Sequence, residues 1–252
     1  MEFVIEAKNL SKTYSIGKDN KQTVLKDVNL QINKGEFVSI MGPSGSGKST
    51  LLYTISGMDR MTTGSVVFQG KELSSLSEKE LSSIRLHNMG FIFQHVHLLK
   101  NLNMFDNIIL SAYLAKKRSH KKINEHALAL MKQTGITEIS KHDMTQVSGG
   151  QLQRVGICRA LINNPDILFG DEPTGALNSK AASEIMELLT DINHAGTAIL
   201  IVTHDVKVAA KTERVLYMYD GVMIGEKRLG KYAGDDKQRE ERLSNWLMEM
   251  DF

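Results

Sequence analysis

The chain has 252 residues, of which 41% are hydrophobic and 24% are charged. This length and composition fit one large globular domain, or one domain with an inserted subdomain. The net charge of +2 gives no overall field that favours nucleic acid as a partner. The single cysteine, Cys158, excludes an internal disulfide and fits a reducing compartment. Residues 1–6 lack the features of a secretory signal, and the strongest apolar run, residues 198–202, is too short to cross a bilayer.

Alternating segments at the start of the chain, residues 3–7 and 24–32, predict an antiparallel β layer interrupted by the polar loop 17–22. Tyr14 comes just before that loop. An aromatic ring there has two interpretations: it stacks on a purine ring, or it is an ordinary half-buried strand residue.

A glycine-rich loop follows the apolar strand-type run 37–41 and precedes residues with helical spacing. It fills the pattern G-x-x-x-x-G-K-[ST] at every fixed position. Because the N–H groups of the loop and of the helix start converge where the helix dipole favours anions, we predict a phosphate cradle. Lys48 would reach the terminal phosphates, and Ser49 would bind Mg²⁺. The candidate nucleotide-binding residues are Gly42, Pro43, Ser44, Gly45, Ser46, Gly47, Lys48, Ser49 and Thr50.

Residues 95–147 lack strand alternation and contain two predicted helices, 105–116 and 124–134. The basic run 116–122 lies between them, and a solvated loop is the favoured interpretation. Contact with anionic lipid or nucleic acid is the alternative. The absence of interleaved aromatic residues argues against nucleic acid.

The second half predicts buried strands at 166–171 and 197–203, a helix at 179–195, and a hairpin around Asp220-Gly221. Polar side chains follow these strands at the edge where open α/β sheets bind their ligands. Asp171 would complete the Mg²⁺ site, and Glu172 would accept a proton from the water that attacks the γ-phosphate. His204 would donate to the γ-phosphate.

Two further elements carry polar groups suited to the same chemistry. Gln94 follows the predicted strand 89–93 and offers an amide to water or Mg²⁺. Residues 148–151, Ser-Gly-Gly-Gln, open a helix with a serine N-cap and form a second anion-binding helix start. Because a helical insertion separates the two helix starts in one chain, two chains arranged head to tail would bring them together more easily.

Taken together, these motifs resemble the ATP-binding subunits of ABC transporters from about Ile5 to Ile224. Tyr14 matches the adenine-stacking aromatic, Gln94 the Q-loop and Glu172 the catalytic glutamate. Residues 42–49 match Walker A and 167–171 match Walker B. His204 matches the switch histidine, and the signature motif is matched by Ser148, Gly149, Gly150 and Gln151. Asn178 departs from the usual aspartate, which removes a charge from the loop that contacts the partner subunit.

The resemblance implies a P-loop NTPase of the α/β class. Its RecA-like parallel sheet would carry the antiparallel β layer and an inserted helical subdomain at about 95–160. The ATP-binding domain would cover residues 1–225, and residues 226–252 would form an amphipathic tail. Two copies would form a homodimer around two ATP with Mg²⁺. They would drive an integral-membrane permease on separate chains, from the cytoplasmic face of the cell membrane, with no nucleic acid.

Residues 91–99 and 171–177 look like the branch that powers macrolide export, lipoprotein release and antimicrobial-peptide resistance. The tail, in which Leu243, Trp246, Leu247 and Met250 share a helical face, resembles the bacitracin-resistance type, although packing on its own domain explains this pattern equally well. The alternatives are a soluble ABC-type ATPase acting on nucleic acid or the ribosome, and a nucleotide-binding module without turnover.

Overall fold

The computed structural model describes residues 3–17, 20–234 and 236–250. The strands are β1 (Phe3–Ile16), β2 (Asn20–Asn33), β3 (Phe37–Met41), β4 (Thr63–Phe68), β5 (Lys71–Glu72), β6 (Met89–Phe93), β7 (Ile167–Asp171), β8 (Ala198–Val202), β9 (Arg214–Tyr219) and β10 (Val222–Arg228). The α-helices are α1 (Lys48–Ile55), α2 (Glu78–Asn88), α3 (Met104–Ala115), α4 (His120–Gln133), α5 (Gly149–Leu161), α6 (Ser179–His194), α7 (Val206–Ala209) and α8 (Asp236–Met248). Short 3-10 turns occupy Leu73–Ser75, Thr137–Ile139 and Met144–Gln146.

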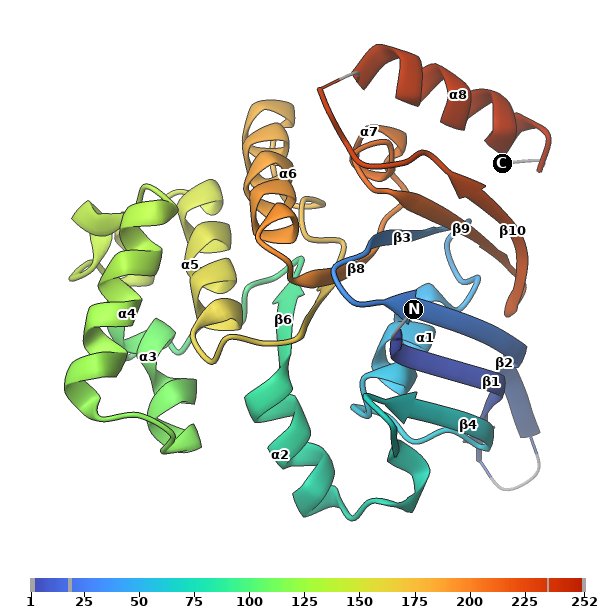
Figure 1. The fold of residues 1–252 in the computed structure, drawn as a ribbon, viewed down its shortest axis with the longest axis horizontal. Coiled ribbons are helices and arrows are strands. Elements are labelled where there is room, and N and C mark those ends of the chain that lie inside the picture. The colour runs from blue at the N-terminus through green and yellow to red at the C-terminus, as the bar shows by residue number, and fades with distance from the viewer. Residues whose placement is uncertain (1–2, 18–19, 235, 251–252) are drawn as a thin grey trace.

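A six-stranded sheet with the order β10-β9-β3-β8-β7-β6 forms the centre of the molecule (Figure 1). Its strands pair in parallel except at the β9–β10 edge, which is antiparallel. Every residue of β3 and β8 is buried, as their continuous apolar sequences predict for strands covered on both faces. The predicted hairpin at Asp220-Gly221 is confirmed by the pairing of β9 with β10.

The predicted antiparallel layer is confirmed as a second sheet with the order β2-β1-β4-β5. Its first strand is longer than predicted, because β1 pairs with β2 from Phe3 as far as Ile16. The layer packs over α1 and shares one hydrophobic core with β3, β7 and β8. The alternation of apolar and polar residues stops after residue 7 because the register of the β1–β2 pairing shifts there, and not because the strand ends.

Helices α3, α4 and α5 pack around a core of their own, to one side of the central sheet (Figure 1). Cys158 is fully buried in this core. The prediction of a solvated loop at 116–122 is wrong for its last three residues, which form the first turn of α4. The helix begins at His120, and the Ser119 side chain caps it by accepting from the N–H of Lys122. A serine before a run of long polar residues is a start signal that the charge pattern obscured.

The C-terminal helix α8 packs against α7, β9 and β10 (Figure 1). Leu243, Trp246 and Leu247 are buried there around Tyr217, so the apolar face of the tail is covered by its own domain. Arg239 on the same helix is buried and donates to the backbone carbonyls of Ala210, Thr212, Leu229, Gly230 and Lys231. None of the helices formed by the described residues has the length and apolarity needed to span a bilayer.

Candidate functional site

The loop between β3 and α1 has a backbone that glycine makes possible. Gly42 has φ +149°, and a Cβ there would lie 2.0 Å from the carbonyl oxygen of Met218. Gly47, the N-cap of α1, has φ +100°, and none of the described side chains caps this helix. The first N–H groups of α1 are therefore available to an anion.

Lys48, the first residue of α1, lies across this loop. Its ammonium donates to the carbonyls of Gly42 at 2.8 Å and Pro43 at 2.7 Å. Burial lowers the pKa of Lys48, while the nearby carboxylates of Glu172 and Asp171 act in the opposite direction. The arrangement holds a positive charge next to the free end of the helix.

Asp171, the last residue of β7, lies opposite the first turn of α1. Its Oδ1 accepts from the hydroxyl of Ser49 at 2.8 Å, and its Oδ2 accepts from the hydroxyl of Tyr53 at 2.5 Å. Both donors lie on α1, one turn apart. Burial and the hydrogen bond to Asp171 raise the pKa of Tyr53, so its hydroxyl remains a donor at neutral pH.

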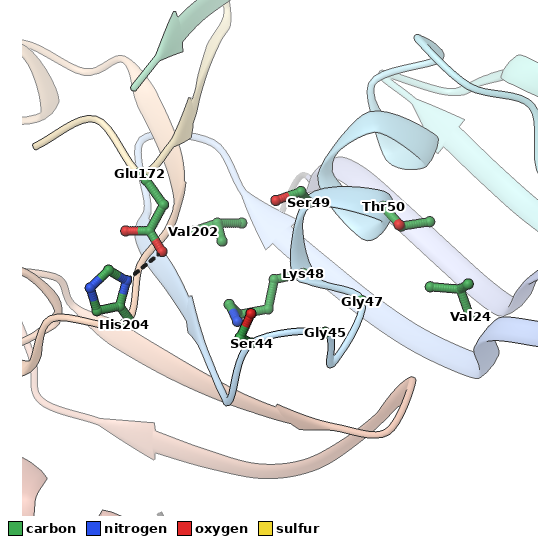
Figure 2. Close-up of a pocket in the computed structure, with 10 residues that line it drawn as sticks. All are labelled: Val24, Ser44, Gly45, Gly47, Lys48, Ser49, Thr50, Glu172, Val202 and His204. Carbon is green, nitrogen blue, oxygen red and sulfur yellow. Dashed lines mark hydrogen bonds and ion pairs between the residues drawn. The ribbon is translucent and has the colours of Figure 1, made fainter. Parts of the chain in front are cut away.

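Glu172 and His204 extend from the ends of β7 and β8 and meet at the mouth of the loop (Figure 2). Their side chains are joined by a hydrogen bond of 2.9 Å between Nδ1 of His204 and Oε1 of Glu172. Glu172 has φ +48°, a conformation that is uncommon for a residue with a Cβ. With Lys48 and Ser49, the two residues line a cavity of about 410 Å³.

The same cavity is bordered on the side of α1 by Thr50 and by Val24 of β2 (Figure 2). Burial and Asp59 raise the pKa of Tyr14, and the Thr50 side chain acts in the opposite direction, so Tyr14 of β1 lies near this side of the cavity. Tyr14 is 37% exposed, and its hydroxyl donates to Asp59 at 2.6 Å. The sequence-predicted residues around the loop are thus brought together from separate segments of the chain.

Two of the predicted groups are arranged differently. Gln94 follows β6 and lies against Gly175, in the turn after Glu172, rather than in the wall of the cavity. Residues 148–151 are also outside the described lining of the cavity. Ser148 caps α5 by accepting from the N–H of Gln151 at 3.3 Å, and the Gln151 side chain accepts from the N–H of Ser148 at 2.9 Å.

The start of α5 lies next to the segment that contains Asn178. A Cβ at Gly149 would lie 3.7 Å from Leu177, and one at Gly150 would lie 3.5 Å from Ala181. The Asn178 side chain accepts from the N–H of Ala181 at 2.9 Å and caps α6. Asparagine therefore performs the capping role here without the charge of an aspartate.

Sequence reasoning missed three groups around the site. The sequence motifs do not include Tyr53, although its position four residues after Ser49 places both hydroxyls on one face of α1. Val24 and Val202 line the cavity from strands whose sequences are typical of ordinary core. Nothing in their local sequence distinguishes them from other valines in strands, because their place at the site depends on strand pairing.

A parallel sheet, a glycine loop with a lysine at an uncapped helix start, and carboxylates at the neighbouring strand ends define a P-loop nucleotide-binding protein. The family model described as ABC transporter matches residues 25–175. The chain belongs to the ABC transporter family, and it is an ATP-binding, ATP-hydrolysing member of that family.

Individual relatives agree with this assignment. The chain is 44% identical over 222 residues to the bacitracin export ATP-binding protein BceA of Halalkalibacterium halodurans, covering 86% of each chain. It is 41% identical over 223 residues to the macrolide export ATP-binding/permease protein MacB of Pasteurella multocida, covering 88% of this chain and 34% of that protein. The chain thus spans about a third of the length of the MacB relatives.

Solved structures give the same result. The dimeric bacterial ABC transporter cassette MJ0796 aligns with a TM-score of 0.84 at 41% identity, covering 90% of this chain and 100% of that chain. A second structure, of MJ0796 as a dimer in a post-hydrolysis state bound to ADP and Pi, aligns with a TM-score of 0.83 at 40% identity. By sequence, the MJ0796 protein of Methanocaldococcus jannaschii is 43% identical over 230 residues.

Proposed function

We propose that two copies of this chain close head to tail around two ATP molecules and hydrolyse them to drive transport. The proposal rests on one observation: within the described part of one chain, the start of α5 does not border the cavity that holds the phosphate loop. Lys48, Glu172 and His204 border one cavity, whereas the start of α5 lies outside its described lining. A second copy would supply its residues 148–151 as additional anion-binding N–H and hydroxyl groups. The dimers reported for MJ0796 support the formation of a dimer.

Within such a site each of the chain's own residues has a separate role in ATP binding and hydrolysis. The loop N–H groups and Lys48 hold the phosphates, and the terminal phosphate lies toward Glu172. The Glu172 carboxylate accepts the proton of the attacking water. His204 is hydrogen-bonded to Glu172 at 2.9 Å in the free chain and donates to the terminal phosphate when ATP is bound. Tyr14 stacks on the adenine base.

We also propose that the site takes Mg²⁺. The Ser49 hydroxyl and the Asp171 carboxylate are 2.8 Å apart and provide the hard oxygen atoms that Mg²⁺ prefers, with phosphate oxygens and water completing its shell. Gln94 would contribute its amide oxygen to the ion. The ion would neutralise negative charge that develops on the phosphates.

The membrane partner that we propose is a permease on a separate chain, which holds this subunit at the cytoplasmic face of the membrane. A groove of about 450 Å³ lies between α2, β6, α3 and α5 and is lined by apolar side chains together with Arg85 and Arg159. Phe93 lines this groove and directly precedes Gln94. A permease segment in the groove would therefore contact the end of β6, and Gln94, the next residue, would link that contact to the ATP site.

In this proposal residues 1–225 form the ATP-binding domain, the helical subdomain at about 95–160 transmits its movement, and residues 226–252 form a tail. The cargo is an antimicrobial peptide, a lipoprotein or a drug-like compound. The names of the BceA and MacB relatives, which refer to bacitracin and macrolide export, support this class of cargo.

The dimer is tested by comparing Glu172→Gln with Glu172→Gln/Ser148→Arg in Mg-ATP, using size-exclusion chromatography and a binding titration. The single variant should lose ATP hydrolysis and accumulate as a dimer. The double variant should remain monomeric while still binding ATP at its own phosphate loop, because Ser148 acts on the ATP of the other copy. Glu187→Gln, an exposed glutamate on α6, is the control. If the double variant dimerises as well as the single variant, the head-to-tail arrangement is contradicted.

The permease interaction is tested in detergent extracts of membranes, with the tagged chain as bait. A multi-span membrane protein should copurify with the parent chain and with Leu128→Ala, which alters an exposed side chain on α4. Ser111→Trp, which fills the groove, should abolish the association. Recovery of ribosomes or nucleic acid in place of a membrane protein would contradict the transport function.

A further inference from the structure

Tyr14 is held by two residues that nothing above assigns to the site. Asp59 accepts from the Tyr14 hydroxyl through Oδ2 at 2.6 Å and from the Lys12 ammonium through Oδ1 at 2.6 Å. Lys12 also donates to the carbonyl of Arg60 at 2.6 Å, and the Arg60 N–H donates to Asp59 at 2.8 Å. The Lys12–Asp59 ion pair thus connects β1, next to Tyr14, to the segment between α1 and β4.

The contacts fix the ring as well as the hydroxyl. The Lys12 nitrogen lies over the Tyr14 ring, 4.6 Å from its centre, which is within the range of a cation–π contact. Lys12 is only 8% exposed, so this contact is shielded from solvent, while Tyr14 is 37% exposed. One face of the ring is therefore used by the protein, and a planar ligand has only the opposite face to stack on.

The protonation states favour a lasting connection. Burial, together with the hydrogen bond to Asp59, raises the pKa of Tyr14, so the hydroxyl stays protonated and continues to donate. Burial alone would raise the pKa of Asp59, but the hydrogen bonds from Lys12 and Tyr14 outweigh it and lower the pKa overall. Asp59 is therefore an anion at neutral pH, and the Lys12–Asp59–Tyr14 connection persists.

We propose that Asp59, together with Lys12, is a positioning residue for nucleotide binding: it holds the Tyr14 ring at the edge of the cavity so that the nucleobase stacks on its free face. This rests on the proposed function, in which Tyr14 stacks on the base. Asp59 itself need not touch the nucleotide. Its contribution is to fix the ring before the base arrives, which reduces the ordering cost of stacking.

The test compares two ligands that share a triphosphate and differ in the base. Isothermal titration calorimetry measures binding of Mg-ATP and of Mg-tripolyphosphate to the full chain and to Tyr14→Ala, Asp59→Asn and the double variant. Tyr14→Ala should weaken ATP about tenfold, and Asp59→Asn about fivefold. Tripolyphosphate should bind all four proteins equally. In the double variant, Asp59→Asn should add nothing to the loss from Tyr14→Ala.

Two further variants sharpen the comparison. Tyr14→Phe keeps the ring and removes only the hydroxyl that Asp59 accepts from, so it should weaken ATP as Asp59→Asn does. Glu78→Gln neutralises an exposed carboxylate that pairs with Arg85, away from the cavity, and should leave both ligands unaffected.

Each failure has a different meaning. If Asp59→Asn weakens tripolyphosphate as much as ATP, or adds its full effect to Tyr14→Ala, then Asp59 supports the phosphate loop or the fold and the inference is overturned. If Tyr14→Ala binds ATP as the parent does, base stacking on Tyr14 is itself wrong. Base stacking is also wrong if the parent chain binds ATP no more tightly than tripolyphosphate. If the parent binds neither ligand, the proposed function fails.

Discussion

The backbone N–H of Gly221 donates to the carbonyl of Ser46 at 3.0 Å, so the tight turn of the β9–β10 hairpin supports the phosphate loop from behind. The same turn is anchored to β2, because the N–H of Lys26 donates to the carbonyl of Gly221 at 2.9 Å. A hairpin that lies far from the loop in sequence therefore determines where the loop lies between the two sheets.

Gly221→Ala should disturb this support. Gly221 has φ +81°, and a Cβ there would lie 2.3 Å from the carbonyl oxygen of Val24. We expect the free energy of unfolding to fall by about 2 kcal/mol, together with a loss of ATP affinity. Gly135→Ala is the control, since Gly135 has φ +68° but open space around it. Chemical denaturation and ATP titration measure both effects, and equal behaviour of the two variants would contradict a role of the turn in the site.

Tyr53→Phe removes one of the two hydroxyls that hold Asp171. Because groups bonded to a metal-binding carboxylate fix its orientation, we expect the Mg²⁺ concentration that half-saturates Mg-dependent ATP binding to rise about tenfold. Binding of ATP without Mg²⁺ should not change. Tyr113→Phe removes a tyrosine hydroxyl that bonds Asn124 in the helical region, and it serves as the matched control. An unaltered Mg²⁺ dependence in Tyr53→Phe would show that the Ser49 bond suffices.

Arg239→Met leaves five backbone carbonyls without their buried donor. Because unsatisfied buried acceptors are costly, we expect the free energy of unfolding to fall by about 3 kcal/mol. Arg242→Met, at an exposed position on the same helix, should change it by less than about 0.5 kcal/mol. The comparison is made by urea denaturation. Similar midpoints for the two variants would mean that the apolar face of α8 alone holds the helix in place.

Cys158 should be unreactive while the chain is folded. Burial raises the pKa of its thiol to about 11, and its sulfur lies 3.2 Å from the hydroxyl of Thr134. At pH 8 we expect no reaction with a thiol reagent in buffer and complete reaction in urea. Because the folded state binds this proton more tightly, the thiol's contribution to stability is lost as the pH rises from about 8.5 towards the folded value. Rapid labelling of the folded chain would show that the α3–α5 core opens locally.

Several features of the site follow directly from local sequence. The phosphate loop is identified by its own pattern, and Asp171, Glu172 and His204 are identified by their places at strand ends. The capping residues Ser148 and Asn178 lie where the structure has helix starts, although the sequence pattern predicts a cap only at Ser148. These features depend on residues a few positions apart.

Other features depend on pairing that no local pattern encodes. Gly42 must be glycine because Met218, from a distant strand, lies directly against it. The Lys12–Asp59 pair joins residues on different elements, so neither residue stands out in its own segment. The length of β1 was missed because its register shifts with β2 interrupt the alternation that identifies a strand.

The position of β3 has a consequence for how the chain acquires its fold. Ile40, just before the phosphate loop, pairs with Val202 on one side and Leu216 on the other. Such non-local pairing makes folding slow, because long loops must close before the contacts form. The phosphate loop is synthesised well before β8 and β9, the strands that pair with β3. Nucleotide binding would then report that synthesis and folding of the whole sheet are complete, and a nascent chain that ends before β9 would lack the cradle.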